Sequence, residues 1–291
     1  MTEKQGVNIA AHAKINLSLD VLRRRKDGYH DLSMIMQQLD LCDQVRIHLS
    51  REPGILIKTD TAFLPNDRNN IAWRAAELMG KRSGMDLQGS GVVIDIQKRI
   101  PVSAGLAGGS ADAAAVLKGL NQLWRLGMSL EELQILALPL GADVPFCLMG
   151  GTALAEGIGD RLTPLKMSRA YWVVLVKPPV SVSTREVYQN LDLKNLRKHP
   201  DNLSLITALW DADVKRMGAS MANVLETVTI PMVPEISEIK QKLLEYNASV
   251  SLMSGSGPTV FGLFKDREKA RAAGKKMARI YREVHVTHTV T

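Results

Sequence analysis

Alternation of apolar and polar residues at several places along the chain predicts β-strands. In residues 13–21 (AKINLSLDV) every second side chain is apolar, which is the pattern of a strand with one buried face. Residues 91–97 (GVVIDIQ) follow the same period. Two further strands are expected at 32–41 and 44–49, after a turn at Asp27-Gly28.

Three helices are predicted before residue 150, two from the spacing of apolar residues and one from a capping box. The first is 71–79, where apolar residues recur every three or four positions. A second helix is predicted by the apolar positions 113, 116, 117, 120, 123 and 124, with Gly127 as its stop. Ser129 and Glu132 have the spacing of a capping box, so a third helix is expected to begin there.

The second half of the chain predicts an α+β layer. A strand is expected at 172–176, after a turn at Thr163-Pro164. From Pro234 onward the order is helix, strand, turn, strand, helix, strand, which is typical of helices on one face of a largely antiparallel sheet. The segments are 235–246, 249–253, 259–264, 268–281 and 284–289. A boundary near 156–165 then divides the chain into domains at 1–160 and 161–291.

Composition narrows the class of protein. Apolar residues make up 45% of the 291 positions, which is enough for a core, and aromatic residues only 4%, so the core must be mostly aliphatic. No apolar run is long enough for a membrane span, and the N-terminus lacks the apolar stretch of a signal peptide. Cys42 and Cys147 are the two cysteines, too few for a disulfide framework. These features favour a reduced, cytoplasmic location without a membrane partner.

The net charge of +7 leaves several partners open. A basic protein attracts nucleic acid, an acidic membrane surface or a polyanionic small molecule. The densest basic cluster is the segment 23–26 (RRRK), and the other charges are scattered. A solvated basic surface is therefore the favoured interpretation.

A glycine-rich stretch, IPVSAGLAGGSADAAAVL at 100–117, directly precedes the second predicted helix. Glycine lets backbone N–H groups approach a ligand closely, and the first turn of a helix has unpaired N–H groups. A glycine loop that enters a helix is therefore a natural phosphate site, although a plain strand-to-helix turn has similar composition. Ser110 adds a hydroxyl for phosphate or Mg²⁺.

Known phosphate-loop motifs do not match this stretch. No lysine follows the glycines, as a Walker A loop requires, and Gly105, Ala107 and Ser110 occupy the glycine positions of the dinucleotide fingerprint. The protein-kinase triplets H-R-D and D-F-G are absent as well. A nucleotide bound here would need another fold.

Two charged residues stand in apolar surroundings. Asp143 lies within LGADVPFCL, where a carboxylate is costly unless it is paired or functional. It is either a helix cap or satisfied buried group, or a base for a hydroxyl nucleophile. Lys14 lies in the first predicted strand and either extends to solvent or faces a transferring phosphoryl group.

A second glycine segment, Gly255-Ser256-Gly257-Pro258, separates two apolar strands. It is either an ordinary hairpin turn or a second loop that offers N–H donors to a ligand. The residues alone favour neither interpretation.

Together these segments resemble the GHMP kinase superfamily, which has a lysine-containing first strand, a P-x-x-x-G-L-x-G-G-S loop and a C-terminal glycine loop. At a finer level, AKINLSLDVLRRRKDGYHDLSMIMQQLDLCD and LPLGADVPFCLMGGTALAEGIGD are similar to two signatures of the 4-diphosphocytidyl-2-C-methyl-D-erythritol kinase family. The resemblance covers about residues 13–264. It implies a two-domain α+β fold with a ribosomal-protein-like N-terminal domain and a ferredoxin-like C-terminal domain. The active site is then expected in the cleft between them.

The resemblance also implies a reaction, in which ATP phosphorylates the 2-hydroxyl of the family's cytidine substrate in the non-mevalonate route to isoprenoid precursors. Lys14 and Asp143 match the catalytic pair, and Mg²⁺ is implied near Ser110. Asn69 and Asn70 lie where the adenine pocket is expected. The residues matched to the ATP loop are Pro101, Val102, Ser103, Ala104, Gly105, Leu106, Ala107, Gly108, Gly109, Ser110 and Ala111. Those matched to the substrate site are Asn16, Tyr29, His30, Thr184, Tyr188, Gly255, Ser256 and Gly257.

The chain departs from the family at Ala107, where glycine is frequent. Alanine costs little there if φ is negative, so no loss of activity is expected. The tail 280–291 belongs to no recognised motif.

Two alternatives remain at this stage. The first is a GHMP kinase for another small alcohol, such as homoserine or mevalonate, against which the DGYH segment and Tyr188 argue. The second is a non-enzymatic nucleic-acid-binding module, which should show a concentrated basic stripe with interleaved aromatic residues. The favoured kinase is expected to be a monomer or weak homodimer that binds ATP and a cytidine diphosphate sugar-alcohol, with no nucleic-acid partner.

Overall fold

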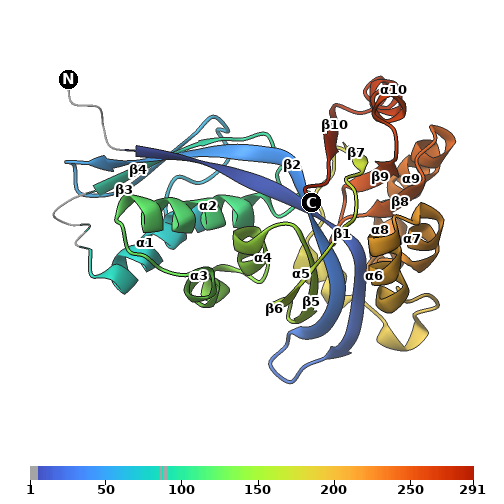
Figure 1. Ribbon diagram of the computed structural model, residues 1–291, viewed down its shortest axis with the longest axis horizontal. Coiled ribbons are helices and arrows are strands. Elements are labelled where there is room, and N and C mark those ends of the chain that lie inside the picture. Colours follow the sequence, from blue (N-terminus) through green and yellow to red (C-terminus); the bar gives the residue numbers. More distant parts are fainter. Residues whose placement is uncertain (1–5, 86, 88–90) are drawn as a thin grey trace. The chain divides into compact units, whose positions relative to one another are not determined.

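The computed structural model describes residues 6–85, 87 and 91–291, and the chain forms two compact units (Figure 1). The first unit contains the residues up to Ala13, Leu41–Val102 and Ala107–Gly150; the second contains Lys14–Asp40, Ser103–Leu106 and Gly151–Thr291. Each unit is thus discontinuous in sequence. The division at residue 160 expected from the sequence stays a prediction, and residues 1–5 of its first domain, with 86 and 88–90, lie outside the described residues.

The strands of the first half are longer than the sequence predicted. β1 is Gly6–Arg24, which confirms the strand expected at 13–21. The two strands expected at 32–41 and 44–49 are wrong as separate elements, because β2 runs unbroken through His30–Ser50. Cys42 and Asp43, which lie between the two predicted strands, are part of β2, and Asp43 is fully buried.

Part of a six-stranded sheet forms the core of the first unit. β4 (Gly91–Gln97) pairs antiparallel with β2 and parallel with β3 (Gly54–Thr59), a strand that the sequence analysis missed. The sheet order is β3-β4-β2-β5-β6, and β1 also pairs with β2.

Helices cover one face of this sheet in the first unit (Figure 1). A Cβ on Gly119 would lie 2.4 Å from the Cδ1 of Ile47, so the glycine lets α2 approach β2 closely. The capping box of α3 is confirmed by both hydrogen bonds, 2.8 and 3.2 Å long, between Ser129 and Glu132. α2 ends at Leu123, before the expected stop at Gly127, because Arg125 already takes a positive φ of 53°. The helices are α1 (Ile71–Ser83), α2 (Gly108–Leu123), α3 (Leu130–Ala137), η1 (Leu138–Leu140) and α4 (Val144–Met149).

A hairpin of β5 (Thr152–Gly157) and β6 (Arg161–Leu165) opens the continuous part of the second unit. The turn expected at Thr163-Pro164 is therefore wrong, since both residues lie inside β6. β6 is the last strand of its sheet, and proline is tolerated on such an edge because no neighbour needs its missing N–H.

A four-stranded antiparallel sheet completes the second unit, in the order β10-β7-β9-β8. With α9 and α10 packed on it (Figure 1), the chain order strand, helices, strand, strand, helix, strand confirms the ferredoxin-like domain. The tail without a recognised motif contains β10, which pairs with β7. The elements are β7 (Trp172–Lys177), α9 (Glu235–Glu245), β8 (Val250–Met253), β9 (Val260–Phe264), α10 (Arg267–Met277) and β10 (Glu283–His288).

Short helices between β7 and α9 were not predicted. A signal for four of them is nevertheless present, because Ser183, Asp192, Asp201 and Asp213 each accept a backbone N–H as N-caps. The helices are α5 (Thr184–Gln189), η2 (Leu193–Asn195), α6 (Asn202–Asp211), α7 (Val214–Ser220) and α8 (Glu226–Met232). Among the described residues, none of the helices combines the length and apolar character that a membrane span requires.

Candidate active site

The glycine-rich stretch ends at the start of α2, as expected. Ala107 is the N-cap of this helix and its side chain makes no capping hydrogen bond. The N–H groups of the first turn are therefore not satisfied by a side-chain cap, and they carry the positive end of the helix dipole. This arrangement can bind an anion such as phosphate.

Ala107 does not have the negative φ that was assumed from the sequence. Its φ is +57°, in the left-handed region, whereas the sequence analysis tied the low cost of alanine to a negative φ. The left-handed conformation is unfavourable for a residue with a Cβ, by about 1–2 kcal/mol.

Ala107→Gly is therefore expected to raise the free energy of unfolding by about 0.5–1 kcal/mol, because the gain at positive φ exceeds the entropy that glycine adds to the unfolded chain. Urea unfolding would measure the change. The matched control is Ala115→Gly inside α2, which should lower stability by about 1 kcal/mol. A loss at both positions would contradict the explanation from φ.

The two glycine loops contact each other within the second unit. The Ser254 hydroxyl donates a 2.9 Å hydrogen bond to the carbonyl oxygen of Gly105. A Cβ on Gly105, whose φ is +73°, would lie 2.2 Å from the carbonyl oxygen of Ser254. A Cβ on Gly255 would lie 3.2 Å from the carbonyl oxygen of Gly105. Close backbone approach therefore requires glycine at 105, a reason the sequence could not give.

The second glycine segment is a β8–β9 turn as well as part of this contact. The turn is closed by a 2.9 Å hydrogen bond from Ser254 N–H to the carbonyl oxygen of Thr259. Within the turn, Ser256 is buried and its hydroxyl lies 2.7 Å from that of Thr184 at the start of α5. Residues 72 positions apart in the sequence thus supply neighbouring hydroxyl groups.

Lys14 is buried beside the first loop. Its backbone N–H donates to the carbonyl oxygen of Leu106 at 3.1 Å, so β1 holds the loop directly. Its ammonium group donates a 2.8 Å hydrogen bond to Oδ1 of Asn16. With 4% of its surface exposed, Lys14 does not extend to solvent, and the surface interpretation is wrong.

Ser110 and Asp143 both belong to the first unit. Asp143 occupies the N-cap position of α4, but its side chain makes no capping hydrogen bond, so the interpretation of the residue as a cap is wrong. A Cβ on Gly141 would lie 4.0 Å from the Ser110 hydroxyl. The segment that leads to Asp143 therefore passes close to the first turn of α2.

A buried charge cluster of Asp43, Lys98 and Asp112 supports the start of α2, and the sequence analysis did not find it. The Lys98 ammonium donates to Asp43, and to Asp112 at 2.7 Å. The other oxygen of Asp43 accepts the N–H groups of Arg99 and Ile100, at 2.5 and 2.8 Å. The cluster thus fixes both ends of the loop that follows Ile100.

Burial and the neighbouring charges act in opposite directions on the pKa values of the cluster. Burial raises the pKa of Asp112 to about 7, although Lys98 opposes this rise. Burial would lower the pKa of Lys98, but the two carboxylates together raise it above its usual value. Oδ1 of Asp112 is buried and has no hydrogen-bond partner.

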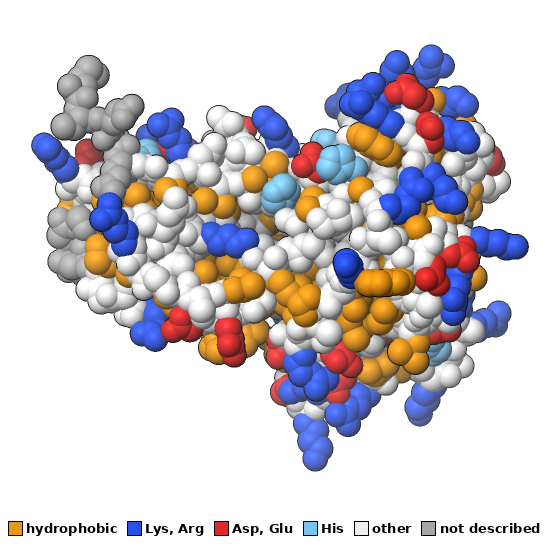
Figure 2. All heavy atoms as spheres, viewed as in Figure 1, with side chains coloured by type: hydrophobic (Ala, Val, Ile, Leu, Met, Phe, Trp, Pro, Cys, Tyr) orange, Lys and Arg blue, Asp and Glu red, His pale blue; other side chains and the backbone are white. Residues whose placement is uncertain are grey.

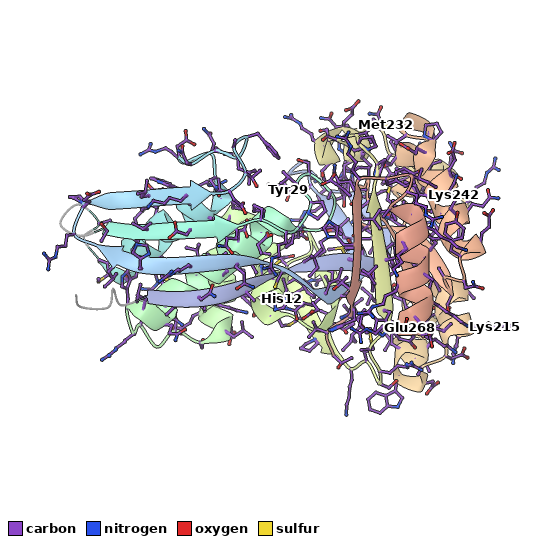
Figure 3. All side chains as sticks on the ribbon, turned by 90° about the horizontal axis from the view of Figure 1, so that it is seen from above. His12, Tyr29, Lys215, Met232, Lys242 and Glu268 are labelled. Atoms are coloured by element: carbon purple, nitrogen blue, oxygen red, sulfur yellow. The ribbon has the colours of Figure 1, made fainter. Side chains whose placement is uncertain are left out.

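The residues matched to the cytosine site lie in the second unit. The rings of His30 and Tyr188 are in contact, with centroids 5.2 Å apart. Burial, followed by the charge of Arg24, lowers the pKa of His30, so its ring is neutral at pH 7. Tyr29, labelled in Figure 3, has 61% of its surface exposed.

Ion pairs hold the turn that presents Tyr29. Arg25 pairs with Asp27 at 2.9 Å and with Asp31 at 3.1 Å. Hydrogen bonds to Arg25 lower the pKa of Asp27, and hydrogen bonds to Arg23 and Arg25 lower that of Asp31. The basic segment RRRK is thus partly neutralised by its own turn.

Asn69 and Asn70 have structural roles at the start of α1. Asn70 caps the helix by accepting the N–H of Ala72 at 2.9 Å, and its amide donates to the carbonyl oxygen of Pro65. Asn69 is bound to Asp67. Their place beside an adenine ring stays a prediction.

The structure brings most of the predicted residues into two groups. In the second unit, hydrogen bonds and backbone contacts link Lys14 and Asn16 to the first loop, and that loop to Gly255. In the first unit, Ser110 lies beside the segment that leads to Asp143. Tyr29 is exposed, with 61% of its surface accessible.

Family models match parts of both halves of the chain. The family model for the N-terminal domain of GHMP kinases matches residues 70–151, and that for the C-terminal domain matches residues 205–283. A solved homoserine kinase from Cytophaga hutchinsonii has the same fold, with a TM-score of 0.78 at 22% identity over 100% of this chain and 96% of its own.

Closer relatives share one name. The 4-diphosphocytidyl-2-C-methyl-D-erythritol kinase of Alkaliphilus oremlandii is 49% identical over 97% of this chain and 96% of its own length. That of Clostridioides difficile is 48% identical over 97% and 95%. A crystal structure of 4-(cytidine 5'-diphospho)-2C-methyl-D-erythritol kinase has a TM-score of 0.83 at 33% identity, over 98% of this chain and 100% of that one. The chain belongs to the GHMP kinases and, within them, to the 4-diphosphocytidyl-2-C-methyl-D-erythritol kinase family.

Proposed function

We propose that this chain transfers the γ-phosphoryl group of ATP to the 2-hydroxyl of 4-diphosphocytidyl-2-C-methyl-D-erythritol, a step of the non-mevalonate route to isoprenoid precursors. The observation that carries the proposal is the uncapped start of α2, entered by a glycine loop that β1 and the second glycine loop both hold. Phosphoryl transfer depends mainly on positioning and charge stabilisation, which such a rigid set of N–H donors supplies.

Lys14 and Asp143 are the proposed catalytic residues. Asp143 accepts or orients the proton of the 2-hydroxyl, whose oxygen attacks the γ-phosphorus as the bond to ADP breaks. Lys14 neutralises charge on the transferring group. Burial of Lys14 and its hydrogen bond to Asn16 support this role, because they limit the positions open to its ammonium group.

Mg²⁺ is the proposed metal, with Ser110 as a contact. Within the described ranges, no three His, Cys, Asp or Glu side chains are grouped as a metal site of their own. Mg²⁺ commonly uses only one or two protein ligands besides substrate phosphates and water. The hydroxyl of Ser110 in the first turn of α2, with Gly141 beside it, fits this need. When bound, Mg²⁺ would neutralise phosphate charge.

The cytidine base is proposed to bind near Tyr29, His30 and Tyr188. The contact between the rings of His30 and Tyr188 supplies an aromatic surface on which a base can stack. Neutral His30 has one donor and one acceptor for the base edge. Asn16, Thr184, Gly255, Ser256 and Gly257 are the proposed polar contacts to the rest of the substrate.

Tyr29→Ala is expected to weaken binding of the cytidine substrate about tenfold, the size of one base-stacking contact, and to leave the Kd for ATP unchanged. Isothermal titration calorimetry with each ligand would measure this. Trp210→Ala, which removes another exposed aromatic side chain, is the control and should change neither affinity. Equal losses for both ligands in the Tyr29 variant would argue against stacking.

The nucleic-acid-binding alternative has less support. Lys and Arg side chains lie singly or in small groups on the face shown in Figure 2, without a continuous stripe. Both substrates of the proposed reaction are polyanions, so the net charge of +7 has another use. A monomeric or weakly dimeric cytoplasmic enzyme is part of the proposal.

An ATP-consumption assay with Mg²⁺ tests the proposal. The substrate 4-diphosphocytidyl-2-C-methyl-D-erythritol is compared with homoserine and mevalonate at equal concentration. Turnover with the cytidine substrate alone is expected. Turnover with homoserine or mevalonate would overturn the substrate assignment, and no turnover in the folded protein would overturn the kinase assignment.

A further inference from the structure

A cavity of about 440 Å³ in the second unit belongs to none of the groups described above. Its wall combines segment 221–227, the edge strand β8 and the loop after η2. The volume lies in the range of small-molecule sites. It is therefore large enough for a ligand and is formed entirely within one unit.

The charged residues at this cavity are mainly cationic. Arg197, Lys198 and Lys240 line it, with Glu226 as the one acidic lining residue among those described. Lys240 is bound to Glu226 at 2.5 Å. No described acidic side chain pairs with Arg197 or Lys198, so both cations can bind an anionic group.

Apolar residues complete the wall. Met221, Val250 and Leu252 line the cavity together with Ser251, and these residues suit a ligand with an apolar body.

The wall also holds the second glycine loop. The amide of Asn223 donates to the carbonyl oxygens of Met253 and Gly255, at 2.9 and 2.7 Å. Glu226 accepts the N–H of Met253 at 2.9 Å. Any ligand that moves Asn223 or Glu226 therefore moves the loop that contacts Gly105.

We propose that this cavity binds a small amphiphilic anion, a phosphate ester or diphosphate with a short apolar chain, and that its occupancy alters the second glycine loop. Arg197 and Lys198 bind the anionic head. The apolar residues contact the chain. Binding of the anion does not depend on the proposed kinase function, whereas the effect on the loop rests on it.

Binding is tested on the full chain by calorimetry with hexyl phosphate, in the presence of a saturating non-hydrolysable ATP analogue that occupies the nucleotide site. Saturable binding is expected for hexyl phosphate. Inorganic phosphate and hexanol should each bind at least about tenfold more weakly, because phosphate lacks the apolar chain and hexanol lacks the anionic head. Binding of inorganic phosphate as tight as that of hexyl phosphate would overturn the amphiphile assignment, and absence of saturable binding would overturn the site.

Two variants locate the site. Arg197→Ala/Lys198→Ala should weaken hexyl phosphate about tenfold or more through loss of charge-assisted hydrogen bonds. Lys269→Ala/Lys275→Ala on α10 removes the same charge from exposed positions and should leave binding unchanged. Equal weakening in both would mean non-specific attraction and overturn the proposal.

In the kinase assay, saturating hexyl phosphate should change the KM for the cytidine substrate at least twofold in wild type but not in the Arg197→Ala/Lys198→Ala variant. An unchanged KM in an active wild-type enzyme would overturn the effect on the loop, whereas loss of turnover without ligand would concern the kinase function alone.

Discussion

Asp143→Asn is expected to lower kcat about 10³-fold, the contribution of a well-placed general base, while the Kd for ATP changes less than about twofold. The amide keeps the size of the side chain but neither accepts the substrate proton nor carries charge. Asp143 does not cap α4, so the change removes no capping hydrogen bond from the helix. Single-turnover kinetics and ATP titration would separate the two effects.

The control for Asp143 is Asp211→Asn, which removes an exposed carboxylate at the end of α6 and should leave kcat unchanged. Near-wild-type turnover in the Asp143 variant would show that another group takes the proton. A parallel loss of ATP affinity would instead place Asp143 mainly in nucleotide binding.

Lys98→Met is expected to lower the free energy of unfolding by about 3–5 kcal/mol at pH 8, because it leaves the carboxylates of Asp43 and Asp112 buried without a counter-charge. Urea unfolding monitored by circular dichroism would measure the loss. The control is Lys81→Met on α1, whose ion pair with Glu77 is on the surface and should contribute less than about 0.5 kcal/mol.

The loss in Lys98→Met should depend on pH. A carboxyl whose pKa is raised by folding binds its proton more tightly in the folded state, so stability falls as pH rises through that pKa. Burial raises the pKa of Asp112 to about 7, and removal of Lys98 takes away the charge that opposes this. The destabilisation should therefore be smaller at pH 5 than at pH 8.

The double variant Lys98→Met/Asp112→Asn should recover part of the stability at pH 8, since only Asp43 then remains charged. An equal loss at pH 5 and pH 8, without recovery in the double variant, would mean that Lys98 contributes packing rather than charge.

Local patterns were enough to predict much of the fold. The strand at 91–97, the capping box at Ser129 and Glu132, and the ferredoxin-like order after residue 234 all depend on short-range periodicity or on hydrogen bonds between near neighbours. The separate strands at 32–41 and 44–49 failed for the opposite reason. Asp43 is polar, yet its partners Lys98, Arg99 and Ile100 lie more than 50 positions away, so local polarity suggested a break that tertiary contacts remove.

By itself the sequence determined the residue types of the candidate site, because a glycine loop before a helix, a lysine in a strand and an isolated aspartate are local features. Only the tertiary structure shows the backbone conditions that individual loop residues must meet. Gly105 must lack a side chain because the backbone of residue 254 approaches it, and Ala107 has a positive φ that its neighbours do not reveal. Contacts between residues far apart in the chain set these conditions, and no local pattern encodes such distances.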